Sequence, residues 1–282
     1  MTKTVVIVGG GSAGWLTAGI IAARHNPLDT ADQGIKVILL ESPDVANLGV
    51  GEGTWPTMRD TLRQIGISEV DFLKACDVSF KQGSQFINWQ RGEGESYYHP
   101  FVPPAGYGSL NLAAHWLNGD SDLNFADAVC PQGKVCDLRL APKTPQTPEY
   151  AFGLNYGYHL NAGKFVELLK SHCVDKLGVD YQIGHVDQIL SADNGDISGL
   201  SLSNGEQISG DLFVDCTGFA ALLIGKHYQV PFVSQRDCLF NDTALAVQVN
   251  HADENTPIAS CTKSTAQSSG WVWDIALPTR RG

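Results

Sequence analysis

The glycine pattern near the start of the chain constrains the fold more than any other feature. A G-x-G-x-x-G pattern spans residues 9–14, between the apolar run 4–8 and the apolar-faced segment 15–25. A short apolar run is typical of a buried parallel strand, and the segment after the glycines predicts a helix. In such a loop the glycines allow a tight turn, close approach of a pyrophosphate, and close helix–strand packing. The predicted cofactor-binding residues of this loop are Gly9, Gly11, Ser12, Ala13 and Gly14.

A second apolar run, residues 35–41, follows the predicted helix and ends at Glu41, which completes a βαβ unit. A carboxylate at this strand end can accept hydrogen bonds from ribose hydroxyls, and the N-terminus of the helix can bind the phosphates. A solvated acid at the strand end is the alternative reading of Glu41. The pattern indicates a dinucleotide cofactor but does not separate NAD from FAD.

The later part of the chain favours FAD. Residues 162–177 predict a helix, and residues 179–209 predict strands joined by hairpins at Asn194-Gly195 and Asn204-Gly205. A further buried strand, residues 211–215, follows. This order is typical of large FAD domains, whereas NAD domains continue with plain βα repeats. Two residues at the end of the last strand join the predicted cofactor-binding set, Asp215 and Gly218.

The predicted organisation is α/β with two regions. Residues 91–149 are rich in Gly, Pro, Asn and Asp and predict a long excursion with short helices, and residues 243–250 and 269–276 alternate as antiparallel strands do. We therefore predict two discontinuous regions. They are an FAD-binding domain, 1–90 with 156–225, and a substrate-side region, 91–155 with 226–282.

The composition excludes several classes of partner. The net charge of −11 argues against nucleic acid and anionic membranes, which repel an acidic surface. The sequence has no apolar run long enough to span a bilayer and enters a strand directly after its first residues, so we expect a cytoplasmic protein. Its 7 cysteines are scattered and odd in number, which favours reduced thiols. Cys130 and Cys136 lack a second ligand pair at zinc-like spacing, so no metal site is predicted.

Six segments together resemble one family. They are VVIVGGGSAGWLTA at 5–18, LGVGEGTWPTM at 48–58, SFKQGSQFINW at 79–89, YGYHLNAGKFVELL at 156–169, DLFVDCTGFAALLI at 211–224 and GWVWDIALP at 270–278. The chain resembles the flavin-dependent halogenases, in particular the tryptophan halogenase group. The glycine loop is shared with many flavoproteins, whereas the GEGT loop, the lysine segment and the W-x-W-x-I segment are specific in combination.

The resemblance implies a three-layer, Rossmann-like FAD-binding domain of the glutathione-reductase and p-hydroxybenzoate-hydroxylase type, with an antiparallel substrate-side sheet. It also implies FAD used as FADH2, with O2 and halide, and a separate flavin reductase as partner. Hypohalous acid would form and would halogenate an electron-rich aromatic molecule such as tryptophan or another indole. The oligomeric state is not fixed by the resemblance, which leaves a homodimer open.

The resemblance also assigns residues. Lys81 matches the family's catalytic lysine; from spacing alone it reads as an ordinary solvent-facing lysine. The W-x-W-x-I segment is thought to keep the substrate away from the flavin, although packing in a sheet core is the plain alternative. The predicted barrier residues are Trp271, Trp273 and Ile275. The predicted flavin-contacting loop residues are Gly49, Val50, Gly51 and Glu52.

Two features depart from the family. The usual proline after W-x-W-x-I is replaced by Ala276, and Pro278 follows two residues later. Family members also continue well past Gly282, so we expect this chain to be the N-terminal portion of a longer protein. The remainder would carry the acid that assists the lysine and most of the substrate pocket. An aromatic hydroxylase of the same fold that uses NAD(P)H directly, and a non-catalytic flavin-binding protein, are the alternative functions.

Overall fold

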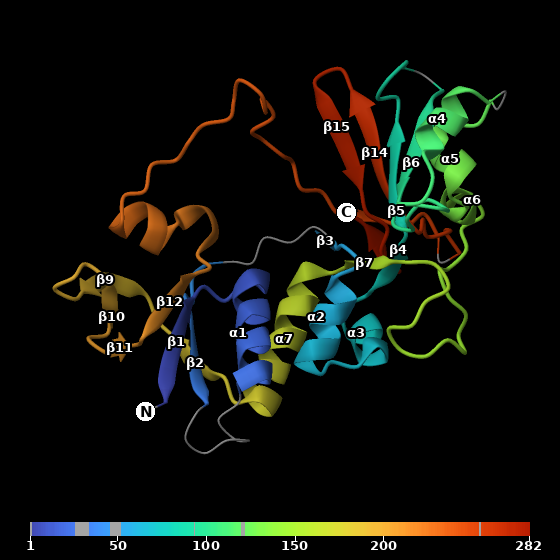
Figure 1. Ribbon diagram of the computed structural model, residues 1–282. Coiled ribbons are helices and arrows are strands. Elements are labelled where there is room, and N and C mark those ends of the chain that lie inside the picture. The colour runs from blue at the N-terminus through green and yellow to red at the C-terminus, as the bar shows by residue number, and fades with distance from the viewer. Residues whose placement is uncertain (1, 26–33, 46–51, 93, 120–121, 254) are drawn as a thin grey trace. The chain divides into compact units, whose positions relative to one another are not determined.

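The computed structural model describes residues 2–25, 34–45, 52–92, 94–119, 122–253 and 255–282. The chain packs as two compact units (Figure 1). The first comprises Met1–Leu48, Gln64–Ile67 and Ala162–Asp242, and the second comprises Gly49–Arg63, Ser68–Asn161 and Thr243–Gly282. The assignment of a cofactor domain and a substrate-side region stays a prediction. Among the described helices, none has the length and apolar character needed to cross a membrane.

The first unit is built on a four-stranded sheet in which every neighbouring pair is parallel, as the apolar runs predict. The strand order is β12-β1-β2-β8. The strands are β1 (Lys3–Val8), β2 (Ile35–Glu41), β8 (Asp180–Ile183) and β12 (Leu212–Asp215). Helix α1 (Ser12–His25) connects β1 to β2 and completes the predicted βαβ unit.

Two layers cover this sheet. On one face the three-stranded antiparallel meander packs against alternate residues of β1 and β2, and Leu200 and Ile208 share a core with Val6 and Ile38. The meander consists of β9 (Val186–Ser191), β10 (Ile197–Leu202) and β11 (Gln207–Ser209). Both predicted hairpins are confirmed, because Gly195 and Gly205 have φ values of 89° and 87° in the turns that join these strands.

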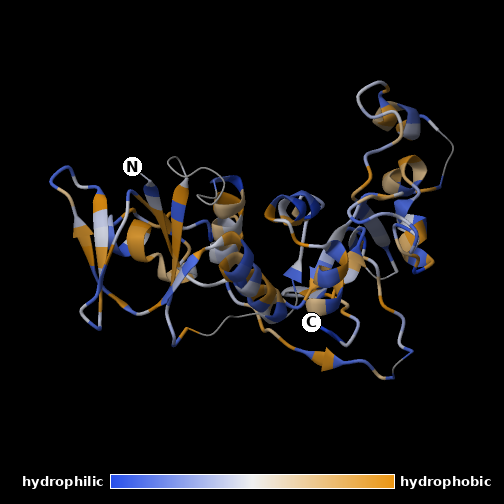
Figure 2. Cartoon of the chain, turned by 90° about the horizontal axis from the view of Figure 1, so that it is seen from below, coloured by the Kyte–Doolittle hydropathy of each residue, from blue (hydrophilic) through white to orange (hydrophobic). Residues whose placement is uncertain are grey.

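Helices α1 and α7 (Ala162–Leu177) pack together, and α1 contacts β1 and β2. The buried residues of α7 follow the i, i+3, i+4, i+7 spacing of one helix face: Ala162, Phe165, Val166, Leu169 and Cys173. This spacing places them on one side of the helix, and the helices in Figure 2 accordingly carry both hydrophobic and hydrophilic residues. Each large apolar side chain buried in this way contributes about 1.5–3 kcal/mol to folding. After β12 the chain forms a short 3-10 turn, Gly218–Ala220, and a π turn, Leu222–His227.

The second unit contains two sheets that concern the site. An antiparallel sheet has the order β3-β7-β4 and consists of β3 (Glu52–Gly53), β7 (Gly157–Leu160) and β4 (Ser79–Lys81). A mixed sheet has the order β15-β14-β5-β6. Its strands are β5 (Gly83–Ile87), β6 (Ser96–Pro100), β14 (Thr262–Gln267) and β15 (Gly270–Asp274). A further pair joins β13 (Val249–Asn250) to β16 (Arg280–Arg281).

The helices of the second unit are short, as predicted for the excursion. They are α2 (Met58–Ile65), which ends in the first unit, α3 (Glu69–Ala75), α4 (Leu112–Leu117), α5 (Phe125–Val129) and α6 (Gln132–Asp137).

Two expectations about this unit are corrected. The predicted antiparallel substrate-side sheet is mixed: β14 and β15 pair antiparallel as predicted, but β14 pairs with β5 in parallel. These strands come from distant parts of the chain, so no hairpin fixes their relative direction. The predicted strand at 243–250 is also wrong over most of its length, since only Val249–Asn250 is a strand. Among the described residues its pairing partner is the two-residue β16, so alternation alone does not extend it.

Candidate functional site

The glycine pattern forms the turn between β1 and α1 in the first unit. Gly9 has a φ of 120°, and a Cβ at this position would lie 2.2 Å from the carbonyl oxygen of Cys216. A Cβ on Gly14 would lie 1.9 Å from the carbonyl oxygen of Gly9. Both distances are far inside van der Waals contact, so both positions require glycine. The turn leaves the N-terminus of α1 beside the ends of β1 and β12, an arrangement able to hold a pyrophosphate.

Glu41 ends β2 next to this turn. A Cβ on Gly10 would lie 2.3 Å from Glu41 Cδ, so the carboxyl group lies directly against the backbone of Gly10. Glu41 Oε2 accepts a hydrogen bond from the Tyr181 hydroxyl at 2.6 Å and lies 3.7 Å from Lys170 Nζ. The Lys170 ammonium also lies 4.2 Å from the centre of the Tyr181 ring. The acid is therefore oriented by β8 and α7 before any ligand binds.

Asp215 ends β12, and donors of its own loop occupy its carboxylate. The Thr217 hydroxyl donates to Oδ1 at 2.6 Å, and the Leu223 and Ile224 amides donate to Oδ2 at 2.8 and 3.0 Å. Burial works against ionisation, but these hydrogen bonds outweigh it and hold the pKa of Asp215 below its usual value. Gly218, with a φ of 60°, begins the following turn. Asp215 thus fixes this turn, and contact of either residue with a cofactor stays a prediction.

The GEGT loop is described only from its acid onward. Gly49, Val50 and Gly51 lie outside the described residues. Glu52 and Gly53 form β3, and the Glu52 side chain is exposed. A Cβ on Gly53 would lie 3.0 Å from Lys81 Nζ. The glycine therefore leaves room for the lysine ammonium group in the second unit.

Lys81 ends β4, and it is buried, with 5% of its surface exposed. Its Nζ lies 5.6 Å from the ring centre of Phe101, 5.9 Å from that of Trp55 and 6.0 Å from that of Trp273. Trp55 and Phe101 also contact each other, with ring centres 5.4 Å apart. The lysine is therefore surrounded by aromatic side chains from three separate segments. We call these three rings the aromatic box.

The residues after Lys81 explain why the SFKQG segment holds it there. The Gln82 amide donates to the Ser260 carbonyl at 2.7 Å, and its side-chain Nε2 donates to the Leu140 carbonyl at 2.8 Å. A Cβ on Gly83 would lie 2.4 Å from the carbonyl oxygen of His99 on β6. The chain therefore passes from β4 to β5 through Gly83, where only glycine fits, and the hydrogen bonds of Gln82 fix this connection.

Burial lowers the pKa of Lys81, and Cys261 acts electrostatically in the opposite direction. Within the described residues, no carboxylate forms an ion pair with Lys81. A desolvated ammonium beside aromatic faces gains cation–π attraction but loses most of its hydration. The site therefore favours the neutral amine more than water does.

His159 lies on the same face of the β3-β7-β4 sheet as Lys81 and is fully buried. Its Nε2 is 2.8 Å from the Thr262 hydroxyl, and its Nδ1 is 3.5 Å from the Ser79 hydroxyl. Burial, reinforced by the positive charge of Lys81, lowers the pKa of His159 to about 3, although a hydrogen bond with the Ala276 backbone opposes the shift. The imidazole is therefore neutral at physiological pH.

The lowered pKa of His159 predicts a loss of stability in mild acid. The unfolded chain binds the proton near pH 6.5 and the folded protein only near 3, so stability is complete above 6.5 and declines as the pH falls. Between pH 7 and pH 5 the free energy of unfolding should fall by about 2 kcal/mol from this group alone. Urea unfolding at several pH values, compared with His159→Gln, measures this. Equal pH dependence in both proteins would contradict it.

The tryptophan pair lies on β15, as the alternation predicts, and both side chains are about half exposed. Trp271 and Trp273 share a face of the strand because they are two residues apart. Their neighbours differ, since Trp271 packs against Trp89 at 6.0 Å between ring centres whereas Trp273 faces Lys81. Ile275 follows the strand and is buried. The barrier role of these residues stays a prediction.

Ala276 stands where the family pattern has proline, and the structure gives it a defined place. It is buried, and its carbonyl accepts a hydrogen bond from the Ser79 hydroxyl. Ser79 precedes Lys81 by two residues on β4. The end of the tryptophan segment is therefore tied to the strand that carries the lysine.

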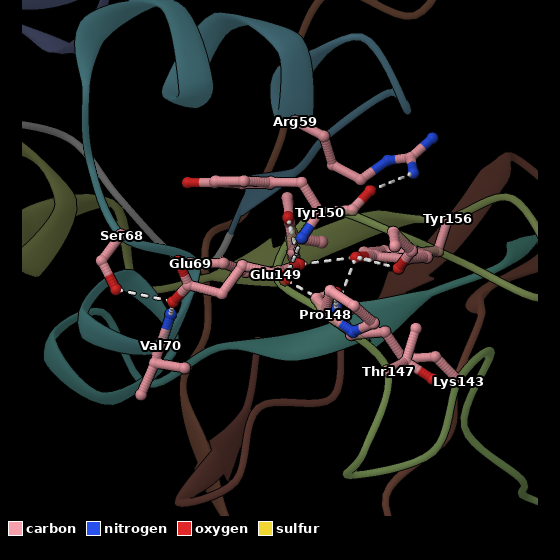
Figure 3. Close-up of polar contacts among 12 residues, drawn as sticks. Arg59, Ser68, Glu69, Val70, Lys143, Thr147, Pro148, Glu149, Tyr150 and Tyr156 are labelled. Atoms are coloured by element: carbon pink, nitrogen blue, oxygen red, sulfur yellow. Dashed lines mark hydrogen bonds and ion pairs between the residues drawn. The ribbon is translucent and has the colours of Figure 1, made fainter.

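A buried acid that sequence inspection did not single out, Glu69, contacts Tyr158, whose side chain points from the opposite face of the β3-β7-β4 sheet. Figure 3 shows the polar contacts of this acid. Glu69 begins α3 and is 1% exposed. Its Oε2 accepts from Lys143 Nζ and the Tyr150 amide, each at 2.6 Å, and its Oε1 accepts from the hydroxyls of Tyr156 and Tyr158, at 2.6 and 2.8 Å. Burial opposes ionisation, but these hydrogen bonds hold the pKa of Glu69 below its usual value.

Sequence reasoning missed several of the residues that shape these sites, and only some had a detectable signal. Phe101 lies in a Pro-rich stretch where its contact with Lys81 cannot be inferred from spacing. Glu69 had a weak signal, since it follows Ser68, whose hydroxyl caps α3, but an acid in a first helical turn is ordinarily solvated. The other missed residues are Gly10, Gly53, His99, Lys143, Lys170, Tyr181 and Thr262.

The family model for tryptophan halogenases matches residues 4–282. Tryptophan 6-halogenase ThaL from Streptomyces albogriseolus is 33% identical over 99% of this chain and 54% of the relative. Tryptophan 7-halogenase RebH from Lentzea aerocolonigenes is 32% identical over 99% of this chain and 54% of the relative. The chain therefore spans about half the length of the curated relatives it matches.

Solved structures agree with these sequence relationships. The crystal structure of a tryptophan halogenase from Shewanella frigidimarina superposes on this chain with a TM-score of 0.94 and 54% sequence identity. That match covers 100% of this chain and 55% of the other. Tar14, a flavin-dependent tryptophan C-6 halogenase from taromycin biosynthesis, superposes with a TM-score of 0.90 at 32% identity.

Proposed function

The chain belongs to the tryptophan halogenase family, and on that basis we propose that its protein is an FADH2-dependent halogenase acting on an electron-rich aromatic substrate. One observation carries the proposal, a lysine buried among three aromatic rings. A buried amine can hold or carry an electrophilic halogen, and the rings can accommodate a flat substrate beside it.

The first unit fits FAD. The Gly9, Gly10 and Gly14 positions form a cradle that any Cβ would fill, and Glu41 lies against it with its carboxylate already oriented. The glycine backbone and the start of α1 would hold the pyrophosphate, and Glu41 the ribose. The helix, parallel sheet and meander layers support the predicted glutathione-reductase and p-hydroxybenzoate-hydroxylase type of FAD domain. When bound as FADH2, the flavin supplies the two electrons with which O2 and halide give hypohalous acid and water.

Lys81 then directs the halogen in one of two ways. As an ammonium, it donates a hydrogen bond to the oxygen of hypohalous acid and makes the halogen more electrophilic. As an amine, its nitrogen attacks the halogen and releases water, and the resulting haloamine returns the amine when the aromatic ring takes the halogen. The lowered pKa of Lys81 favours the second route relative to an ordinary lysine.

The aromatic box supports an indole or another flat, electron-rich substrate. Its rings present apolar faces, and the centre of the His99 ring lies 6.3 Å from that of Trp55. Neutral His159, buried behind Lys81, adds no charge that would compete for halide. The predicted substrate class follows from these shapes.

The two tryptophans should separate in function. Trp273→Ala removes a ring that faces Lys81, so we expect halogenated product to fall about tenfold, with a rise in oxygenated by-products. Trp271→Ala removes a ring that packs on Trp89, so it should change turnover by less than about threefold. Product analysis by mass spectrometry measures both. Equal effects of the two substitutions would contradict a specific role for Trp273.

The test of the proposed function uses the complete product of the natural gene. It is incubated with FAD, a flavin reductase, NADH, O2 and bromide, and a panel of indoles and phenols is analysed by mass spectrometry. A brominated product supports the proposal. An oxygenated product without bromine, with rapid flavin reduction by NADPH alone, supports the aromatic hydroxylase. Oxygen consumption without any modified aromatic supports a non-catalytic flavin-binding protein.

A further inference from the structure

The β3-β7-β4 sheet lies between Lys81 on one face and Glu69 on the other. Lys81 and His159 occupy one face. The other face carries Tyr158 and, in register with it, Phe80, because side chains alternate along each strand. Tyr158 donates its hydroxyl hydrogen bond to Glu69. The acid and the lysine are thus connected through one thin sheet.

The connection runs through packed aromatic rings. Phe80 precedes Lys81 on β4, and its ring lies 5.1 Å from Tyr156 and 6.5 Å from Tyr158. Phe72 of α3 also packs on Tyr158, with ring centres 5.0 Å apart. Close-packed protein interiors transmit displacement, so a shift of the two tyrosine rings moves Phe80 and the strand that carries Lys81.

The negative charge of Glu69 keeps both tyrosines in place. Burial and the carboxylate raise the pKa of Tyr156 and of Tyr158, so both hydroxyls remain protonated donors. Lys143, paired with Glu69 and 9% exposed on its side chain, balances the charge. Each Glu69 oxygen accepts two hydrogen bonds, and a neutral amide side chain, which has one oxygen, cannot accept all four.

We propose that Glu69 is a positioning residue for Lys81, acting through Tyr158, Tyr156 and Phe80. The inference rests on the proposed function, since it assigns Lys81 the halogen-directing role. Glu69 touches neither substrate nor flavin. Its task is to hold the far face of the sheet so that the ammonium or amine of Lys81 meets the aromatic box in one geometry, which directed halogen transfer requires.

Glu69→Gln tests this proposal in the complete natural protein. The glutamine side chain has the same shape as glutamate, but its NH2 group is a donor. That group must face either Lys143 and the Tyr150 amide or the two tyrosine hydroxyls, all of which donate to Glu69 in the wild-type protein. We expect kcat for halogenated product to fall about tenfold, with KM for the aromatic substrate unchanged. The rate of flavin reoxidation should not change, so less product forms per NADH consumed.

Glu149→Gln is the matched control. Glu149 lies on the same loop as Tyr150, and its carboxylate accepts from the Ser68 hydroxyl at 2.7 Å and the Val70 amide at 3.0 Å at the start of α3 (Figure 3). Glu149 therefore holds the same loop against the same helix but accepts no hydrogen bond from Tyr156 or Tyr158. This variant should keep wild-type kcat and product yield. Equal losses in both variants would overturn the proposal, because general loosening of the loop would then explain them.

A spectroscopic readout separates position from stability. Lysines are labelled biosynthetically with 13C and 15N, and the Lys81 side-chain signal, identified with Lys81→Met, is followed by NMR against pH. We expect Glu69→Gln to shift this signal and its midpoint, and Glu149→Gln to leave both unchanged. A Glu69→Gln protein that is only less thermostable, with the same Lys81 signal and kcat, would overturn the proposal.

Tyr158→Phe covers the case in which Glu69→Gln does not fold. This variant retains the ring that packs on Phe80 and removes only the hydroxyl. We therefore expect kcat to fall about threefold and the Lys81 signal to shift in the same direction as in Glu69→Gln. If Tyr158→Phe leaves the Lys81 signal and kcat unchanged, the proposal is wrong. The Lys81 signal also distinguishes this inference from the proposed function. If the wild-type protein forms no halogenated product, the proposed function is wrong, whereas the response of the Lys81 signal to Glu69→Gln still reports on positioning.

Discussion

Lys81→Met should abolish halogenation and leave the fold intact. We expect product formation to drop by about a thousandfold, because the group that polarises or carries the halogen is gone. Methionine fills nearly the same volume without a charge to desolvate, so thermal stability should stay equal or rise. FAD binding should persist, because the glycine turn and Glu41 belong to the first unit whereas Lys81 belongs to the second.

Lys74→Met is the control for this prediction. Lys74 is an exposed lysine at the end of α3, and its replacement should leave product formation and FAD affinity unchanged. Product is measured by mass spectrometry, FAD affinity by the change in flavin fluorescence, and stability by thermal unfolding. Halogenation retained at the wild-type rate in Lys81→Met would remove Lys81 from the mechanism.

Gly9→Ala should eliminate FAD binding and destabilise the first unit. The new Cβ would stand 2.2 Å from the Cys216 carbonyl oxygen, a backbone atom that cannot move without separating β12 from β1. The φ of 120° adds strain for any residue with a Cβ, and the combined penalty is on the order of 3 kcal/mol or more. We expect FAD affinity to fall at least about a hundredfold, measured by fluorescence titration.

Two further glycines calibrate this result. Gly178 follows α7 with a φ of 68° and has open space around its absent side chain, so Gly178→Ala should cost only about 1 kcal/mol and leave FAD binding unchanged. Gly10→Ala meets the flexible end of Glu41, which can rotate away, so FAD affinity should fall about tenfold with the fold preserved. Tight FAD binding by Gly9→Ala would contradict the assignment of the loop.

The glycine turn could be predicted from sequence because every part of its signal is local. The apolar run of residues 4–8, the glycine spacing and the following helix lie within one short segment, and the two Asn-Gly hairpins of the meander are equally local. The steric reason for each glycine is different, because it involves partners distant in sequence. Gly9 faces Cys216, and Gly10 faces Glu41.

Lys81 shows the limit of such reasoning. Its identity as a candidate came from the resemblance, since the periodicity of SFKQG does not distinguish a buried lysine from a solvated one. Its burial depends on Trp55, Phe101 and Trp273, which come from three separate stretches of chain. The same limit explains the mixed sheet, because the parallel pairing of β5 with β14 leaves no mark in either strand's own sequence.

By itself, the sequence determined the local elements: the βαβ unit with its glycine turn, the hairpins of the meander, and the family to which the lysine and tryptophan segments point. These depend on φ preferences, side-chain periodicity and short motifs, which act over a few residues. Only the tertiary structure decided that Lys81 is desolvated among aromatic rings and that Glu69 collects four donors behind its sheet. Desolvation and hydrogen-bond satisfaction are set by which distant segments meet, and that is a property of the packed chain.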